Sequence, residues 1–330
     1  MKPLSLGLLA GAAASVLVGA TSAEAIELRF AHYAAVDHPA HLAAVQFAEA
    51  VAERTNGEVT IAIYPNNELG SPPEQLEQVT LGLIDMTVPT QGGLQTYVRE
   101  FGAVMMPFVF DDYEHAWRVI DGPFAEWTTP LLEDQNLVFL ANWEWGFRNV
   151  TNSVRPVNVP ADMEGLRMRT PPEIQLQAAM EAAGATVEQI AFPELPMALR
   201  QGVVDGQENP LAVIYHFNLY EVQPYLAMTR HVYNSMVHVI NLDAWNQLTP
   251  EQQTILREES VRAAGMFREA NLAAEADLID RLQTEGGMEV TYPDPAAFRA
   301  VMQPAYDRIA EYLGQDTVDR FLEMVEAERQ

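Results

Sequence analysis

The sequence predicts an α/β fold of two lobes, with a cleft between them and one long helix that spans both. Three observations lead to this prediction. Residues 26–89 alternate as β-α-β-α-β, and residues 137–210 repeat that architecture without repeating the sequence. Such alternation is typical of a parallel sheet with helices on both faces. A helical pattern then covers residues 249–285, about 54 Å at 1.5 Å per residue, which is more than one compact lobe requires.

The first series has clear helix and turn signals. Residues 26–31 alternate apolar and polar side chains as a half-buried strand does. Residues 38–54 follow a helical spacing, with Leu42 and Phe47 among the expected core contacts, until an Asn-Gly turn ends the helix. A strand at 58–64, a helix at 72–83 and a short strand at 85–89 are expected to complete the series.

The second series contains two segments with turn character. An aromatic, arginine-bearing turn is expected at 143–148, after a strand at 137–142. The string Asp-Gly-Gln-Glu-Asn-Pro at 205–210 predicts another turn, with Asn209 as the N-cap of a following helix. The remaining strands are expected at 166–169, 186–190, 231–240 and 288–292, and the remaining helices at 172–183, 193–202 and from about 296 and 315.

The first 25 residues have the features of a cleaved secretory signal. Lys2 precedes a short apolar run at 4–18, and Ala23-Glu24-Ala25 matches the small-x-small cleavage pattern. We therefore expect a periplasmic protein. The expected division of the mature chain is 26–146 plus about 235–270 for lobe I, and 147–234 plus about 271–330 for lobe II.

Composition excludes several functions. Lys and Arg number 19 against 46 Asp and Glu, a net charge of −27, which argues against binding nucleic acid or anionic lipid. The chain has no cysteine, so thiolate catalysis and Cys-ligated metals are excluded. It also contains none of the strings G-x-S-x-G, H-E-x-x-H, G-x-G-x-x-G, Walker A or EF-hand. We expect no metal or organic cofactor, no enzymatic activity and a monomer.

Two arginines are candidate ligand groups. Arg169 sits at the carboxyl end of the short strand expected at 166–169, and its planar guanidinium could hold a carboxylate through two parallel hydrogen bonds. Arg148 lies at the same level of the neighbouring segment. By spacing alone, a surface salt bridge is the more common explanation for either arginine, because the protein is so acidic.

These residues also carry a family resemblance. Gly202–Pro210, read as Gly-Val-Val-Asp-Gly-Gln-Glu-Asn-Pro, together with Gly165-Leu-Arg-Met-Arg169, resembles the extracytoplasmic solute-binding proteins of TRAP (tripartite ATP-independent periplasmic) transporters of the DctP type. Similar strings occur in the same order at 65–70, 82–86, 107–108, 146–152 and 219–223, so the resemblance covers the mature chain.

The resemblance implies a bilobal periplasmic binding protein fold and a site for an organic acid. The bound acid would be delivered to the membrane permease subunits of an ion-gradient-driven transporter. In such proteins one arginine clamps the ligand carboxylate, and the motif places it at Arg169. The other candidate ligand-binding residues are Arg148, Asn209, Phe192, Tyr33, His32, Thr90, Gln91, Glu74 and Trp143.

Two alternatives remain open at this stage. One is a secreted α/β hydrolase or lyase that uses Glu74, Glu144 or Glu208 with a histidine. The other is the binding protein of an ATP-driven importer, against which the two pocket arginines argue because they would repel a cationic ligand. The residues do not distinguish a dicarboxylate from a keto acid, a sugar acid or a zwitterion.

Overall fold

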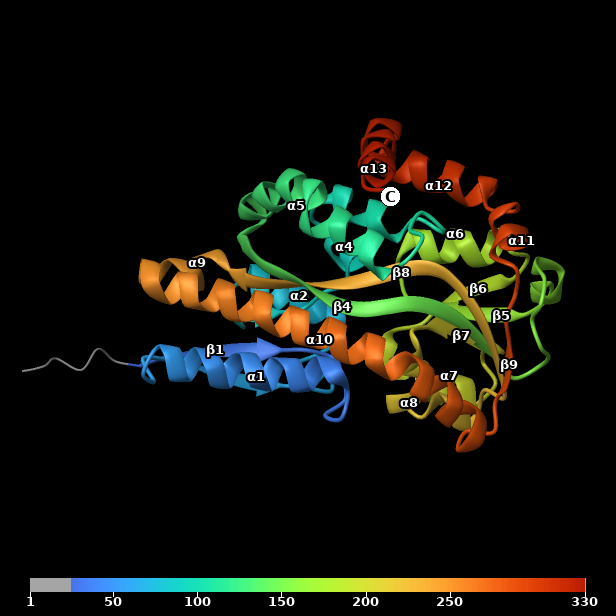
Figure 1. Cartoon of the computed structure of the whole chain (residues 1–330), viewed down its shortest axis with the longest axis horizontal. Coiled ribbons are helices and arrows are strands. Elements are labelled where there is room, and N and C mark those ends of the chain that lie inside the picture. Colours follow the sequence, from blue (N-terminus) through green and yellow to red (C-terminus); the bar gives the residue numbers. More distant parts are fainter. Residues whose placement is uncertain (1–24, 330) are drawn as a thin grey trace, which may run out of the picture.

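The computed structural model describes residues 25–329, which form one nine-stranded sheet between two layers of helices (Figure 1). The predicted signal segment lies outside the described residues, apart from Ala25. The strand order is β2-β1-β3-β8-β4-β7-β5-β6, and β9 pairs with β8. Within the described part of the chain, no helix is long and apolar enough to cross a membrane.

The first third of the chain forms one parallel group of strands, as predicted. β1 (Ile26–Ala31) pairs with β2 (Val59–Tyr64) and with β3 (Met86–Thr87), all in parallel. α1 (Pro39–Arg54) and α2 (Pro72–Thr80) connect them. The prediction that Leu42 is a core residue is wrong: it is 53% exposed, because the buried face of α1 includes Ala43, Ala44 and Phe47 instead.

A second parallel group forms the other end of the sheet. β5 (Arg167–Thr170) pairs in parallel with β6 (Thr186–Gln189) and β7 (Gly206–Asn209). The predicted turn at 205–210 is therefore wrong, because the backbone of β7 pairs with strands on both sides. Asn209 ends this strand, and the N-cap of the next helix is Pro210. The helices of this group are α6 (Ile174–Ala182), α7 (Leu195–Arg200) and α8 (Leu211–His216).

Two long antiparallel strands join the two groups, so the sheet is mixed rather than all parallel. They are β4 (Leu137–Asn152), of 16 residues, and β8 (Tyr225–Asn241), of 17 residues (Figure 1). The predicted turn at 143–148 is wrong, since β4 continues through it. The pairing shifts register between Glu144 and Gly146, and Gly146 has φ +120°, so a local irregularity takes the place of a turn.

The long helix forms as predicted. α10 (Pro250–Thr284) has 35 residues and starts with a capping box between Thr249 and Gln252. It packs against α1, β4 and α8, and so contacts a helix from each parallel group and the long strand that joins the groups (Figure 1). The chain ends with β9 (Glu289–Thr291), α11 (Pro295–Arg299), α12 (Gln303–Leu313) and α13 (Gln315–Ala327).

Two hydrophobic cores lie on the two faces of the sheet. One packs Phe30, Trp143 and Ile240 against α1, α10 and α8. The other packs Phe147 and Val239 against helices of the upper layer in Figure 1. That layer also includes a segment in which no helix was predicted, with α3 (Gln91–Leu94), η1 (Arg99–Met105), α4 (Tyr113–Asp121), α5 (Pro123–Thr128) and η2 (Thr129–Gln135). The remaining short helices are connections, namely α9 (Leu242–Asn246), η3 (Pro160–Met163), η4 (Phe192–Glu194) and η5 (Leu219–Glu221).

Candidate functional site

Buried polar side chains gather at the carboxyl ends of strands from both parallel groups. Ligands of open α/β sheets bind at this edge, because the loops that follow the strands meet there. From the first group come His32, Tyr33, Thr90 and Gln91, and from the second come Arg169, Glu173 and Asn209, with Arg148 supplied by β4.

Arg169 is a buried arginine whose guanidinium has one hydrogen-bond partner among the described residues. The residue is 1% exposed, and its Nε donates to the carbonyl oxygen of Ile190 at 2.8 Å. Its Nη2 is buried without a hydrogen-bond partner, and Arg169 takes part in no ion pair within residues 25–329. Burial lowers the pKa of Arg169 to about 10, so the group stays charged at neutral pH. A buried charge without a partner is costly, and this arrangement favours a ligand of opposite charge over the surface salt bridge.

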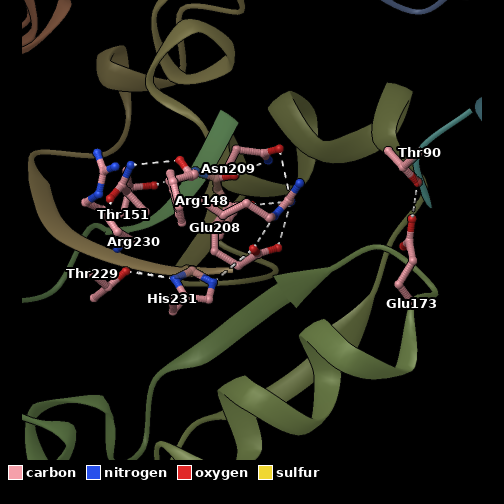
Figure 2. A network of polar contacts seen from close by, with 12 residues as sticks. Thr90, Arg148, Thr151, Glu173, Glu208, Asn209, Thr229, Arg230 and His231 are labelled. Carbon is pink, nitrogen blue, oxygen red and sulfur yellow. Dashed lines mark hydrogen bonds and ion pairs between the residues drawn. The ribbon is translucent and has the colours of Figure 1, made fainter. Parts of the chain in front are cut away.

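Arg148 is equally buried, but the protein itself balances its charge (Figure 2). Nε donates to one carboxylate oxygen of Glu208 at 2.5 Å, and Nη2 to the other at 2.9 Å. Nη2 also donates to Oδ1 of Asn209 at 3.1 Å. His231 Nε2 lies 3.2 Å from the same Glu208 carboxylate. Burial acts to raise the pKa of Glu208, but Arg148 and His231 outweigh it and hold that pKa below its ordinary value.

Glu173 was not among the predicted site residues. It precedes α6 as its N-cap residue and is 8% exposed. Its Oε1 accepts a hydrogen bond from the hydroxyl of Thr90 at 3.1 Å, whereas its Oε2 is buried without a partner (Figure 2). Burial raises the pKa of Glu173, and Arg148, Thr90 and Arg169 oppose that shift. In the sequence, only its position four residues after Arg169 could have indicated a role for Glu173. That signal is weak, because a chain with 46 acidic residues places many of them near an arginine by chance.

Aromatic rings connect the two groups of strands near Arg169. The half-buried ring of Phe192 lies 5.8 Å from that of Tyr33, and the Arg169 guanidinium lies 5.9 Å from the Phe192 ring. The Tyr33 hydroxyl is buried without a partner. Burial raises the pKa of Tyr33, and Glu173 adds to the effect while Arg148 opposes it, so these groups are electrostatic neighbours.

The other predicted residues from the first group have partners in the protein. His32 Nε2 lies 3.1 Å from Nδ1 of His41, and burial lowers the pKa of His32 to about 3, which keeps it neutral at neutral pH. Gln91 donates to Asn142 and to Ser235, each at 3.0 Å, but its Oε1 is buried without a partner.

Two predicted residues lie apart from these contacts. Glu74 is exposed, and its carboxylate accepts hydrogen bonds from the backbone and hydroxyl of Ser71, which caps α2. Trp143 is fully buried in the core beneath α1, and its indole donates to Ser260 at 3.1 Å. Trp145, two residues further along β4, is the tryptophan that contacts the Tyr33 ring, at 5.2 Å. We therefore correct the assignment of Glu74 and Trp143 as ligand contacts.

The acids considered for catalysis are engaged in structural contacts. Glu144 is buried, and its carboxylate accepts hydrogen bonds from Trp117 at 2.7 Å, the Trp145 backbone at 2.9 Å and Tyr233 at 3.2 Å. Glu208 pairs with Arg148. Among residues 25–329, no group of three or more His, Asp or Glu side chains could hold a metal ion.

Comparison with known proteins gives a consistent result. Residues 30–312 match the bacterial extracellular solute-binding proteins of family 7, DctP. The chain is 31% identical to the sialic acid-binding periplasmic protein SiaP of Vibrio cholerae, over 98% of this chain and 99% of that protein. It is 33% identical to the C4-dicarboxylate-binding periplasmic protein DctP of Rhodobacter capsulatus, over 95% and 96%.

Solved structures agree. A TRAP periplasmic solute-binding protein from Polaromonas sp. JS666, crystallised with D-erythronate, superposes with a TM-score of 0.86 at 32% identity, covering 90% of this chain and 98% of that one.

Proposed function

Because the chain belongs to the DctP family of TRAP transporter solute-binding proteins, we propose that it captures a small carboxylate at Arg169 and delivers it to the permease subunits of a TRAP transporter. Members of this family are binding proteins and not enzymes, which removes the hydrolase and lyase alternative. Membership of the TRAP family likewise argues against the alternative that the chain is the binding protein of an ATP-driven importer. The periplasmic relatives support export to the periplasm.

The unpaired guanidinium of Arg169 is the observation that carries this proposal. Its Nη2 is buried without a partner, while the charge of neighbouring Arg148 is balanced by Glu208. A ligand carboxylate on Arg169 would form charge-assisted hydrogen bonds away from bulk water. Relatives whose names state a ligand bind acids, namely sialic acid, C4-dicarboxylates and 2,3-diketo-L-gulonate.

We assign the other contacts by their place around Arg169. Phe192 and Tyr33 would cover the ligand with their rings, and the hydroxyl of Tyr33 is an additional donor. Thr90 and Gln91 would approach from the first parallel group. Arg148 and Asn209 would form the wall behind the ligand, where Arg148 donates directly to Asn209 and is itself held by Glu208.

Ligand contacts from both groups would favour a closed state. In this proposal lobe I comprises residues 26–146 and about 235–270, and lobe II comprises 147–234 and about 271–330. A ligand gripped by both lobes has more contacts when they close, which shifts the population toward the closed state. Small-angle scattering at saturating ligand should then show a smaller radius of gyration than without it, and an unchanged radius would contradict closure.

A thermal-shift screen tests the carboxylate proposal. Ligand that binds only the folded state raises the melting temperature by mass action. Each acid is paired with its uncharged amide, for example succinate with succinamide and gluconate with gluconamide. At least one acid should raise the melting temperature, and its amide should not, because the amide cannot neutralise Arg169. Equal stabilisation by acid and amide, or none by any acid in a broad library, would contradict the proposed function.

A further inference from the structure

We propose that Glu173 selects the ligand by accepting a hydrogen bond from a ligand hydroxyl, so that this chain prefers hydroxylated monocarboxylates to dicarboxylates. The inference rests on the proposed function, since it assumes that the ligand carboxylate lies on Arg169. It assigns a specificity-determining role to a residue that the family motifs in the sequence did not single out.

The first step is the state of the two Glu173 oxygens. Oε1 is used by Thr90, which belongs to the first parallel group, so this contact joins the two groups of strands. Oε2 is buried in a residue that is 8% exposed, and it has no partner within residues 25–329. An ionised carboxylate is only an acceptor. The free oxygen therefore requires a donor, and no described part of the chain supplies one.

The second step is the tight packing that fixes Glu173 in place. A Cβ built on Gly92 of α3 would lie 2.5 Å from Cγ of Glu173 and would also collide with Sδ of Met105. Only glycine lets the α3 backbone approach this closely. The carboxylate is thus held between α3 and the start of α6 and cannot turn outward to solvent without moving that backbone.

The third step is the balance of charge near the ligand. Arg148 and Glu208 neutralise each other, which leaves Arg169 and Glu173 as the unpaired cation and anion. Arg169 accommodates one ligand carboxylate. A second carboxylate close to Glu173 would meet a like charge in a site of low dielectric, whereas a hydroxyl would satisfy Oε2 at no electrostatic cost.

The neighbouring groups favour a hydroxyl over an ammonium. An ammonium near Oε2 would also lie among Arg148 and Arg169, which both act electrostatically on Glu173. Buried polar atoms at the same strand ends include both a donor, the Tyr33 hydroxyl, and an acceptor, Gln91 Oε1. Hydroxyl groups both donate and accept, so a polyhydroxylated acid matches this mixture.

Calorimetric titration with four-carbon probes tests the inference. The probes are erythronate, succinate, butyrate and 4-aminobutyrate, with gluconate, adipate and hexanoate as a six-carbon set. The wild-type protein should bind erythronate or gluconate more tightly than the dicarboxylate of the same length. Glu173→Gln keeps an acceptor for Thr90 but removes the charge. It should weaken binding of the hydroxylated acid roughly 10- to 100-fold, and it should reduce the difference in affinity between that acid and the dicarboxylate of the same length.

Glu188→Gln is the matched control. Glu188 pairs with Arg169 across the ladder between β5 and β6, but its side chain is exposed, so this variant removes the same charge near Arg169 without touching Glu173. It should leave the order of affinities unchanged. Circular dichroism and thermal melting of both variants establish that they fold.

The outcomes separate the two proposals. If Arg169→Ala abolishes binding but Glu173→Gln keeps the wild-type order of affinities, the selectivity inference is wrong and the clamp stands. If the wild-type protein prefers succinate or adipate, or prefers 4-aminobutyrate to erythronate, the assignment of a hydroxyl to Glu173 is wrong. If it binds none of the acids in either set or in the broader library, the proposed function fails with it.

Discussion

Arg148 and Arg169 occupy similar surroundings and differ in how the protein treats their charge. Both lie at the same edge of the sheet, and they are 3% and 1% exposed. Arg148 is held by both carboxylate oxygens of Glu208, which in turn contacts His231. The Nε of Arg169 donates to one backbone carbonyl, that of Ile190, and its buried Nη2 has no hydrogen-bond partner.

Under the proposed function, this difference separates a structural charge from one that binds the ligand. A buried charge that is already paired helps to hold the structure of the site, because removing it would leave its partner as an uncompensated buried charge. A buried charge without a partner weakens the fold, and in this proposal it is retained because it binds the ligand. Perturbed, unpaired groups of this kind mark functional sites, and stability given up at such sites is a recurrent cost of function.

The largest expected effect on stability is that of Arg148→Ala. It leaves Glu208 buried without its counter-ion, which should lower the free energy of unfolding by about 3–5 kcal/mol in urea denaturation. The double variant Arg148→Met, Glu208→Gln removes both charges and should recover part of this loss. A loss below about 1 kcal/mol for Arg148→Ala would show that the pair is not needed, and the comparison of the two arginines would lose its basis.

The two buried glutamates should give opposite pH dependence. The pKa of Glu208 is held below its unfolded value, so its contribution to stability is present above that value and is lost as pH falls through the folded pKa. Burial raises the pKa of Glu173, so the folded state keeps a proton that the unfolded state releases, and stability falls as pH rises above the unfolded value. Denaturation from about pH 3 to about pH 7 covers both ranges, since the Glu208 change lies below the ordinary carboxyl pKa and the Glu173 change above it.

Variants make this comparison explicit. Relative to wild type, Glu208→Gln should become less stable as the pH rises from about 3 to about 5, whereas Glu173→Gln should become more stable as the pH rises from about 4 to about 7. The same sign of slope for both variants would contradict the distinction between the paired and the unpaired side of the site.

Arg169→Ala should have the smallest effect on the stability of the ligand-free protein, within about 1 kcal/mol of wild type. The loss of contact with Phe192 is offset by removal of a desolvated charge. Arg167→Ala should also leave stability close to that of the wild type, because the exposed Arg167 forms an ion pair with Asp205 at 2.6 Å, and exposed pairs of this kind contribute little. Loss of more than about 2 kcal/mol in Arg169→Ala would indicate a structural role for its guanidinium.

The sequence predicted the elements whose signals are local. The capping box of α10 and the alternation in β1 were both correctly interpreted. The errors fell where tertiary pairing overrides local propensity. Gly146 and the aromatic residues around it favour a turn, but β4 is paired along its length and buried on both faces, so strand periodicity was not visible there.

The site was predicted unevenly for a similar reason. Arg169 stood out because its motif and its place at a strand end agree. Spacing could not tell Arg167, which is exposed and paired, from Arg169, which is buried and unpaired, although they lie two residues apart on one strand. Glu173 becomes recognisable only when α3 packs against it, since its burial depends on contacts between the two parallel groups.

Calorimetric titration of Arg169→Ala, Arg169→Lys and Arg167→Ala with the carboxylate found by the thermal-shift screen tests the central claim most directly. Truncating one partner of a buried charged pair typically costs ~2–5 kcal/mol, or roughly 30- to several-thousand-fold in affinity. Arg169→Ala should therefore abolish practical binding, and Arg169→Lys should be impaired because an ammonium lacks the planar fork. Arg167→Ala should bind as the wild type does. Near-wild-type affinity in Arg169→Ala would contradict the assignment of Arg169 as the carboxylate clamp.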